Sequence, residues 1–333
     1  MELPPPLRRA VDAALEGTPL PELARAAEAL SRRYRAERRD GGLHLADEPA
    51  VKAYLATRLP ATYAAVRASL GAVAEARPEL APASLLDLGA GPGTGLWAAA
   101  DCWPGLAEAL LVEASPAMRA WGERLAAEAP VARIAWRASD LLDGLPGAEP
   151  RDLVILAYVL DELAPEALVP LIDRLWTLSA RLLVIVEPGT PAGWRRILAA
   201  RERLLRRGAR IAAPCPHAAA CPLRAPDWCH FSRRLPRSRL HRLAKAGAVP
   251  WEDEKFIYLA AAREAAPLPA ARVIARPRLH KGHVELKLCR ADGGIEERLF
   301  SRRDGAAYKL ARRLDWGDAL PPPGGGQVAV EPP

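Results

Sequence analysis

Four of the five cysteines are spaced so that they could act together as ligands of one metal centre. Three fall within one short stretch and the fourth lies much further along the chain: Cys215, Cys221, Cys229 and Cys289. Four thiolates satisfy either a tetrahedral zinc ion or an iron–sulfur cluster. Zinc ribbons favour Cys-x2-Cys knuckles, and the sequence has none, whereas proline directly after a ligand, as at Pro216 and Pro222, is typical of ferredoxin loops. The spacing predicts a metal site of either kind, with unligated structural thiols as the alternative.

A glycine-rich loop far upstream could hold a nucleotide cofactor. The stretch "LLDLGAGPGTG" follows a predicted strand and precedes a predicted helix. Glycines let the backbone turn sharply and approach a ligand closely. Acidic residues follow at the ends of the next two predicted strands. The residues predicted to contact the cofactor are Asp87, Gly89, Gly91, Gly93, Glu113 and Asp140.

The three carboxylates favour S-adenosylmethionine as the cofactor. Acids in these places can receive an amine, hold ribose hydroxyls and meet an adenine amine. S-adenosylmethionine carries a sulfonium and an ammonium but no phosphate to seat on a helix N-terminus. The Gly-Lys-Ser/Thr of a phosphate-binding loop is also absent from the sequence. A nicotinamide enzyme and a degenerate loop that binds nothing remain the alternatives.

The sequence does not identify catalytic residues. After the fourth predicted strand it reads "AYVLDEL", without the Asn/Asp-Pro-Pro-Tyr/Phe that holds a target nitrogen in many nucleic-acid methyltransferases. Tyr158, Asp161 and Glu187 are the weak candidates, and Glu162 is a further polar group there. Methyl transfer is an in-line displacement that positioning can accelerate. A methyltransferase and a non-catalytic binding protein therefore both remain open.

Positive charge is concentrated beside the cysteines. Acidic residues outnumber basic ones over residues 1–190, whereas basic residues dominate over 191–260. We predict that a metal centre presents the cations after Cys229 to RNA phosphates. An ordinary solvated surface is the alternative. The predicted RNA-binding residues are Arg233, Arg234, Arg237, Arg239, Arg242 and Lys245.

The surrounding elements predict an α/β fold. Apolar strands alternate with helices from residue 84 to residue 188, which is typical of a doubly wound parallel sheet. A basic helix is predicted over 193–211 and a further strand over 253–263. The predicted organisation is 1–80 as an N-terminal helical region, 81–208 as the S-adenosylmethionine-binding core, 209–250 as a cysteine-rich basic insert, 251–318 as the last core strands and a β-rich extension with the fourth cysteine, and 319–333 as a disordered tail.

Several stretches resemble one known family. They are "LLDLGAGPGT", "AYVLDEL", "VIVEPGTPAGW", "PCPH", "DWCHFSRRLPRSRLHRLAKAG" and "EDEKFIYL", with a late "LC". Together they are similar to the methyltransferase-like small-ribosomal-subunit assembly family, which has mitochondrial and bacterial members, over about residues 25–315. The part from the cysteines to "EDEKF" is the most specific.

The resemblance implies a class I S-adenosylmethionine methyltransferase fold with a 4Fe–4S cluster on the four cysteines. It also implies a role with the small ribosomal subunit and its rRNA. No apolar run is long enough to span a membrane, and the first residues are not a Ser-rich, acid-poor amphipathic helix. We therefore expect a cytoplasmic protein with no membrane partner that is a monomer off the ribosome.

Overall fold

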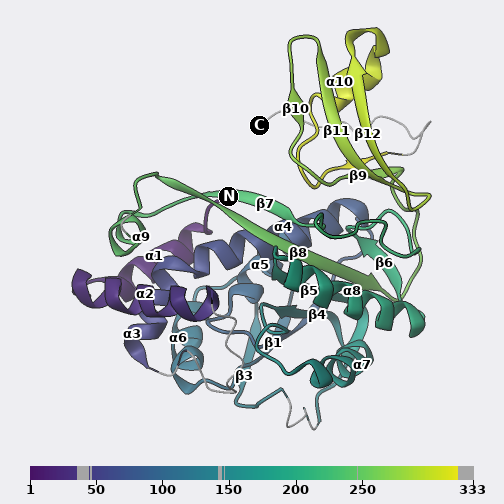
Figure 1. Cartoon of the computed structure of the whole chain (residues 1–333). Coiled ribbons are helices and arrows are strands. Elements are labelled where there is room, and N and C mark those ends of the chain that lie inside the picture. The colour runs from purple at the N-terminus through teal and green to yellow at the C-terminus, as the bar shows by residue number, and fades with distance from the viewer. Residues whose placement is uncertain (36–44, 46, 142–144, 146, 246, 322–333) are drawn as a thin grey trace.

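An eight-stranded sheet forms the centre of the larger unit (Figure 1). The computed structural model describes residues 1–35, 45, 47–141, 145, 147–245 and 247–321. The strand order is β3-β2-β1-β4-β5-β8-β6, and β7 pairs with β8 off this path. The strands are β1 Ser84–Leu88, β2 Glu108–Val112, β3 Arg133–Arg137, β4 Arg151–Ala157, β5 Ser179–Pro188, β6 Arg210–Ala213, β7 Phe231–Pro236 and β8 Trp251–Ala262.

The pairing is that of a class I methyltransferase sheet. The first five strands pair in parallel, β8 is antiparallel to β5, and β6 is antiparallel to β8. The order reverses between β1 and β4, and ligands of open α/β sheets bind at such a switch point, outside the carboxyl ends of the strands. The doubly wound fold predicted from the alternating pattern is therefore confirmed.

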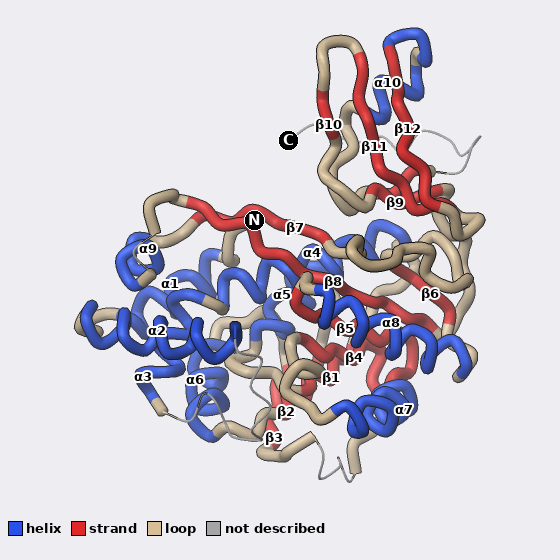
Figure 2. Tube along the Cα trace, viewed as in Figure 1, coloured by secondary structure: helices blue, strands red, loops and turns tan. Residues whose placement is uncertain are grey.

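Helices cover both faces of this sheet (Figure 2). Successive strand residues point to opposite faces, so Leu85 and Ile155 pack on one side while Leu86 and Val154 pack on the other. The first side is covered by α1–α6 and the second by α7 and α8. The helices are α1 Pro5–Leu15, α2 Leu20–Arg35, α3 Glu48–Thr57, α4 Leu59–Ala76, α5 Thr94–Cys102, α6 Pro116–Ala126, α7 Leu168–Leu178, α8 Pro191–Arg206 and α9 Arg239–Ala244.

The N-terminal helices share the core of the sheet. Leu7, Leu23 and Leu59 are fully or almost fully buried in the same apolar cluster as β1. Local capping fixes where α3 begins, because the Asp47 side chain accepts a hydrogen bond from the Ala50 N–H at 2.8 Å. The predicted boundary at residue 80 thus marks a change of secondary structure within one hydrophobic core.

A second, five-stranded sheet carries the fourth cysteine. Its order is β10-β11-β9-β13, with β12 pairing with β11, and its apolar side packs against α10 around Val284, Leu286 and Phe300. Cys289 lies on the opposite side of β11 from these residues. The elements are β9 Ala271–Val273, β10 Arg278–Leu279, β11 His283–Arg290, β12 Ile295–Ser301, α10 Ala306–Ala311 and β13 Ala319–Leu320.

Three predicted boundaries differ from the structure. The basic helix predicted over 193–211 ends at Arg206, because Gly208 takes a left-handed backbone (φ 81°), and β6 follows. Strand β3 ends at Arg137, so Asp140 lies in a loop rather than at a strand end. The tail predicted from residue 319 includes a short strand that pairs with β9; residues 322–333 lie outside the described part of the chain.

Strand β7 was not predicted. It lies in the basic stretch after Cys229 and pairs antiparallel with the long β8. Phe231 and Leu235 are buried while the three polar residues between them are not, so the stretch lacks the regular apolar alternation that predicts a strand. Among the described residues, no helix combines the length and apolar character needed to cross a bilayer.

Candidate functional site

The glycine loop joins β1 to α5 with the geometry that its sequence predicts. Gly89, Gly91 and Gly93 have φ of 64°, 55° and 82°, which glycine adopts without the cost that a side chain imposes. Close packing adds a second constraint, because a Cβ on Gly89 would lie 2.6 Å from a Val159 methyl group. The loop therefore passes tightly over the ends of β1 and β4.

Asp87 is buried beneath this loop. Its side chain accepts a hydrogen bond from the Leu96 backbone, and a Cβ on Gly95 would lie 2.5 Å from its Oδ2. That Oδ2 atom is buried without a hydrogen-bond partner. Burial, with a smaller contribution from Glu113, raises the pKa of Asp87 to about 8. Asp87 thus orders the loop and keeps one oxygen unsatisfied, which is the condition expected of a group that meets a cationic ligand.

Glu113 directly follows β2 and holds the same loop from the other side. Its two oxygens accept hydrogen bonds from the backbone N–H groups of Gly91 at 2.8 Å and Ser115 at 2.7 Å. Burial raises the pKa of Glu113 while these N–H groups oppose the rise. Asp140, in the loop after β3, makes contacts of its own. The structure thus brings Asp87 and Glu113 together at the switch point.

A pocket of about 980 Å³ opens beyond the carboxyl ends of β4 and β5. The N-terminal helices, α9 and β8 enclose it, and both acidic and basic side chains reach its wall. We call it the interface pocket. Its lining is Ala24, Arg25, Ala27, Glu28, Ser31, Tyr54, Arg58, Thr62, Tyr158, Asp161, Pro188, Thr190, Ala244, Lys245 and Glu254.

Tyr158 is the most constrained residue of this wall. It is the one non-glycine residue with positive φ (59°) in the described ranges, and such strain concentrates at functional sites. Its hydroxyl donates to Glu254 at 3.0 Å, and Arg58 contacts the same carboxylate at 3.1 Å. Burial and the Glu254 charge raise the pKa of Tyr158 well above its ordinary value. Tyr158 is therefore a hydrogen-bond donor and not a general base at neutral pH.

The other two catalytic candidates lie in different surroundings, one at the pocket wall and one in the core. Asp161 lines the interface pocket and so stays a candidate. Glu187 does not: it is a fully buried residue of β5, where it accepts hydrogen bonds from Arg196 at 2.7 Å and from the Leu160 N–H at 3.0 Å. These partners give Glu187 a structural role in holding the chain after β4. Neighbouring Glu162 has its pKa raised to about 7, first by burial and then by Asp161.

The structure brings the four predicted metal-binding cysteines to one cavity of about 40 Å³. Three come from the insert between β6 and β7, and Cys289 comes from β11 of the second sheet. Burial raises the pKa of Cys289 to about 12 and that of Cys229 well above its ordinary value, and the neighbouring thiols add to both shifts. These two thiols are therefore protonated at neutral pH without a metal, and metal binding must release protons.

Two buried arginines line the same cavity. Arg201 and Arg272 are 5% and 4% exposed, and neither forms an ion pair with an acid within the described residues. Arg201 donates to the carbonyls of His217 and Ala219, and Arg272 donates to that of Pro214 at 2.8 Å. One N–H-bearing nitrogen of each guanidinium stays buried without a partner. Uncompensated buried charge is costly, so this cavity is suited to an anionic occupant.

His217 contacts the fourth thiol. Its Nδ1 lies 3.2 Å from the Ala219 carbonyl, so this nitrogen carries the proton. Its Nε2 lies 3.4 Å from the sulfur of Cys289. The imidazole is itself almost completely buried. His217 thus links the insert to the second sheet at the cavity.

The predicted cationic array does not lie beside the thiols. Strand β7 carries the chain away from Cys229, and α9 packs against α2 and α3 on the far side of the unit (Figure 1). Arg234 pairs with Asp253 at 2.8 Å and Arg237 with Glu252 at 3.3 Å, so part of the expected charge is neutralised. Arg233 is partly buried on β7 and Lys245 lines the interface pocket, whereas Arg239 and Arg242 are exposed on α9.

Several residues of both sites were missed from the sequence. Arg58 and Glu254 are 196 positions apart and carry no local signal of their pairing. Arg201 and Arg272 look like any surface arginine of a basic chain. Of these residues, His217 alone carries a local sequence signal, because it stands between Cys215 and Cys221.

Comparison with known proteins gives one family match. The family described as "Mitochondrial small ribosomal subunit Rsm22" matches residues 48–321. The human mitochondrial ribosome assembly protein METTL17 is 31% identical over 294 residues, covering 80% of this chain and 62% of the human protein. The mitochondrial Rsm22-cox11 tandem protein 2 of Schizosaccharomyces pombe is 26% identical over 326 residues, covering 82% and 43% respectively. The chain therefore spans less than two thirds of each of these relatives.

Among solved structures, magnesium protoporphyrin IX methyltransferase from Synechocystis PCC 6803 has a TM-score of 0.40 and 17% identity, over 70% of this chain and 91% of that one. The relatives correct one prediction. We expected a cytoplasmic protein, but the matched family is described as mitochondrial and so are both relatives. This finding contradicts the cytoplasmic assignment and points to mitochondria.

Proposed function

Because the chain belongs to the Rsm22 family, we propose that it is a methyltransferase-like factor that acts on the small ribosomal subunit and its rRNA, as a monomer when it is off the ribosome. It binds S-adenosylmethionine at the glycine loop and an iron–sulfur cluster at the four cysteines. The observation that carries the proposal is the meeting of four thiols and two buried arginines at one cavity. Exposed Arg239 and Arg242 remain candidates for phosphate contacts, with Arg233, Arg234, Arg237 and Lys245 in supporting places around them.

The glycine loop fits S-adenosylmethionine in two respects. The unsatisfied Oδ2 of Asp87 is suited to a positive ligand, and the glycines leave room where side chains would collide. Asp87, Glu113 and Asp140 would hold the cofactor's polar groups, with Gly89, Gly91 and Gly93 in backbone contact. When bound, the cofactor supplies an activated methyl group. Tyr158 and Asp161 face the pocket in which an acceptor would be oriented.

The state of Asp87 gives this proposal a pH dependence. A carboxyl with a pKa of about 8 must lose its proton to pair with the cofactor's ammonium. Affinity is therefore expected to rise almost tenfold per pH unit from about pH 6 and to level off above about pH 8. Calorimetry in buffers of different ionisation enthalpy should detect nearly one proton released per cofactor at pH 7.

Asp87→Asn is expected to bind more weakly and to lose this pH dependence. A flat affinity profile in the unmodified protein would contradict the role of Asp87.

The raised pKa of Asp87 has the opposite effect on folding stability: cofactor affinity rises with pH, whereas stability falls. The folded chain holds an extra proton relative to the ordinary value of 3.8, so stability without cofactor should fall as pH rises between about 4 and about 8.

The spacing of the thiols favours a cluster over zinc. A Zn–S bond of about 2.3 Å places the sulfur atoms of a tetrahedral site about 3.8 Å apart. Within the described residues, no three of the four cysteine sulfurs all lie within 4.8 Å of one another. A cuboidal cluster binds each thiolate at a different corner and so suits cysteine sulfurs that lie further apart. Arg201 and Arg272 would compensate the negative charge of such a centre, which supports a charged four-thiolate site of either kind.

The alternative is an assembly factor that binds rRNA without turnover. It is favoured because Tyr158, as a hydrogen-bond donor, cannot serve as a general base. Gly91→Leu separates the two. A side chain at φ 55° is strained, so this variant is expected to lose cofactor binding. Gly105→Ala is the control, because a Cβ there meets open space. If the protein is an enzyme, Gly91→Leu removes both a methyl mark on the rRNA and subunit assembly; intact assembly with no mark missing supports the alternative.

A further inference from the structure

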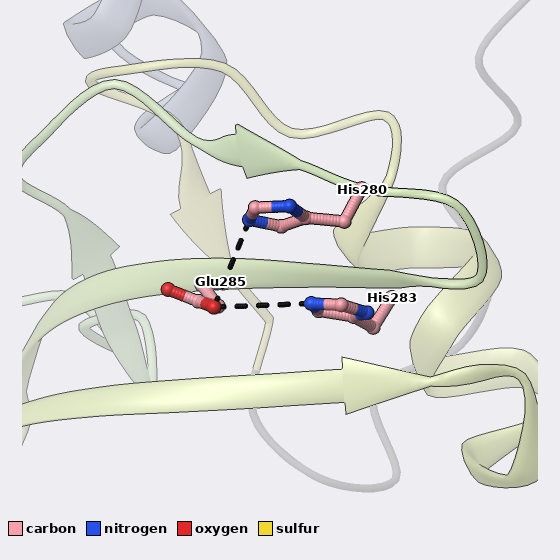
Figure 3. Close-up of side chains that lie close together, drawn as sticks. All are labelled: His280, His283 and Glu285. Carbon is pink, nitrogen blue, oxygen red and sulfur yellow. Dashed lines mark ion pairs between the residues drawn. The ribbon is translucent and has the colours of Figure 1, made fainter.

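The hairpin between β10 and β11 gathers three metal-ligating side chains that neither the cofactor loop nor the thiols use. His280, His283 and Glu285 each offer one ligand atom, and these atoms all lie within 4.8 Å of one another (Figure 3). The Nε2 atoms of His280 and His283 lie 3.7 Å and 3.8 Å from the same oxygen, Oε1 of Glu285. All three side chains are 30–46% exposed, so an ion can reach them.

The fold places these groups together in a regular way. Arg278 pairs with Glu285 and Leu279 with Val284 across the hairpin, so the two histidines face each other at its end. The His280 N–H donates to the His283 carbonyl at 3.0 Å, which closes the turn. The two imidazole rings stack with centroids 4.5 Å apart. His283 and Glu285 are two residues apart on β11 and therefore project from the same face.

The second oxygen of Glu285 is already held. Arg278 contacts Oε2 at 2.8 Å, which leaves Oε1 turned toward the histidines. Arg278 therefore orients the carboxylate as well as neutralising part of its charge. The positive neighbour lowers the affinity for a cation, so we expect moderate rather than tight binding.

We propose that this hairpin binds one divalent transition metal, with Zn²⁺ as the best match. Two imidazoles and one carboxylate are zinc ligands, whereas Mg²⁺ and Ca²⁺ prefer sites made of oxygen alone. Ligand bonds of about 2.1 Å set ligand atoms about 3.4 Å apart in a tetrahedron. The two imidazole–carboxylate distances of 3.7 Å and 3.8 Å therefore need to close by only a few tenths of an ångström, and the stacked imidazole rings must turn so that both nitrogens face the ion. The fourth position is left to water.

This site is separate from the thiol cavity. His283 and Cys289 project from the same face of β11, but six residues of strand separate them by about 20 Å. Zinc at the hairpin would fix the outer end of the second sheet, where β10 is only two residues long. The proposal does not depend on the occupant of the thiol cavity.

Calorimetric titration with ZnCl₂ tests the proposal on the tag-free full chain, after its thiol centre has been filled and free thiols are no longer detected. One further site with micromolar affinity is expected. His283→Ala should abolish it, and Glu285→Gln should weaken it at least tenfold. Lys281→Ala, in the same turn but without a ligand atom in the cluster, is the matched control and should retain the site. All of these side chains are on the surface, so the variants are expected to fold.

Co²⁺ provides a second readout on the same samples. Bound by nitrogen and oxygen, it should give weak visible bands without the strong sulfur-to-metal absorption of a thiolate site. The absence of any zinc site beyond the thiol centre would overturn the proposal. So would a site that survives the His280→Ala/His283→Ala double substitution, because the ligands would then lie elsewhere.

Discussion

Cys229→Ser is expected to strip the protein of nearly all its iron and to destabilise the contact between the insert and the second sheet. Burial first, and then the three other ligand thiols, raise the pKa of Cys229 well above its ordinary value, and all four cysteines line the same cavity. Removing one ligand of four opens the centre. Because the binding free energy of a structural metal centre is also folding free energy, the loss of metal should lower thermal stability as well.

Cys102→Ser is the matched control for this experiment. Cys102 ends α5, and its sulfur lies 3.9 Å from the Arg67 carbonyl. It does not line the thiol cavity. Iron content and visible absorption should therefore match those of the unmodified protein. Equal iron in Cys229→Ser and Cys102→Ser would contradict the assignment of the ligands.

Arg272→Met is expected to lower the reduction potential of the proposed cluster. Its guanidinium lines the cavity and forms no ion pair with an acid in the part of the chain that the structure describes, so it would stabilise the extra negative charge that reduction adds. Removing one positive charge several ångströms away should shift a one-electron potential down by roughly 50–100 mV. Arg201→Met should act in the same direction. Potentiometric titration followed by electron paramagnetic resonance measures the shift.

Two further variants separate charge from packing. Arg272→Lys keeps the positive charge and should restore most of the potential, although a lysine cannot reproduce the paired hydrogen bonds to Pro214 and Gly317. Arg77→Met removes another buried arginine, but one that pairs with Glu79. In this variant the reduction potential of the proposed cluster should be unchanged, even if the stability of the protein falls. An unchanged potential in Arg272→Met would show that the arginine is not a counter-charge.

Local sequence patterns were enough to predict the sheet and the position of the cofactor loop. Apolar strands, a glycine loop and following acids depend on residues close in the chain, and the structure keeps Asp87 and Glu113 at the switch point. The four cysteines could also be grouped, because thiols are rare in this chain and have few alternative roles. Both predictions rest on residue types whose chemistry is restrictive.

The remaining features depend on tertiary contacts that leave no local trace. The cations after Cys229 read as one array, but the structure divides them between β7 and α9 and pairs Arg234 and Arg237 with acids of β8. Glu187 lies near the end of the apolar strand β5, as a site residue could, yet the hydrogen bond from Arg196 of the next helix makes it structural. The interface pocket also needs α2, which is far in sequence from the wall residues Tyr158, Lys245 and Glu254.

Anaerobic purification with iron, zinc and acid-labile sulfide analysis tests the central claim most directly. We expect iron and sulfide in equal amounts, about four of each per chain, with the broad visible absorption of thiolate-bound iron. Stoichiometric zinc without sulfide would contradict the cluster. Four free thiols in the folded protein would contradict the metal centre altogether.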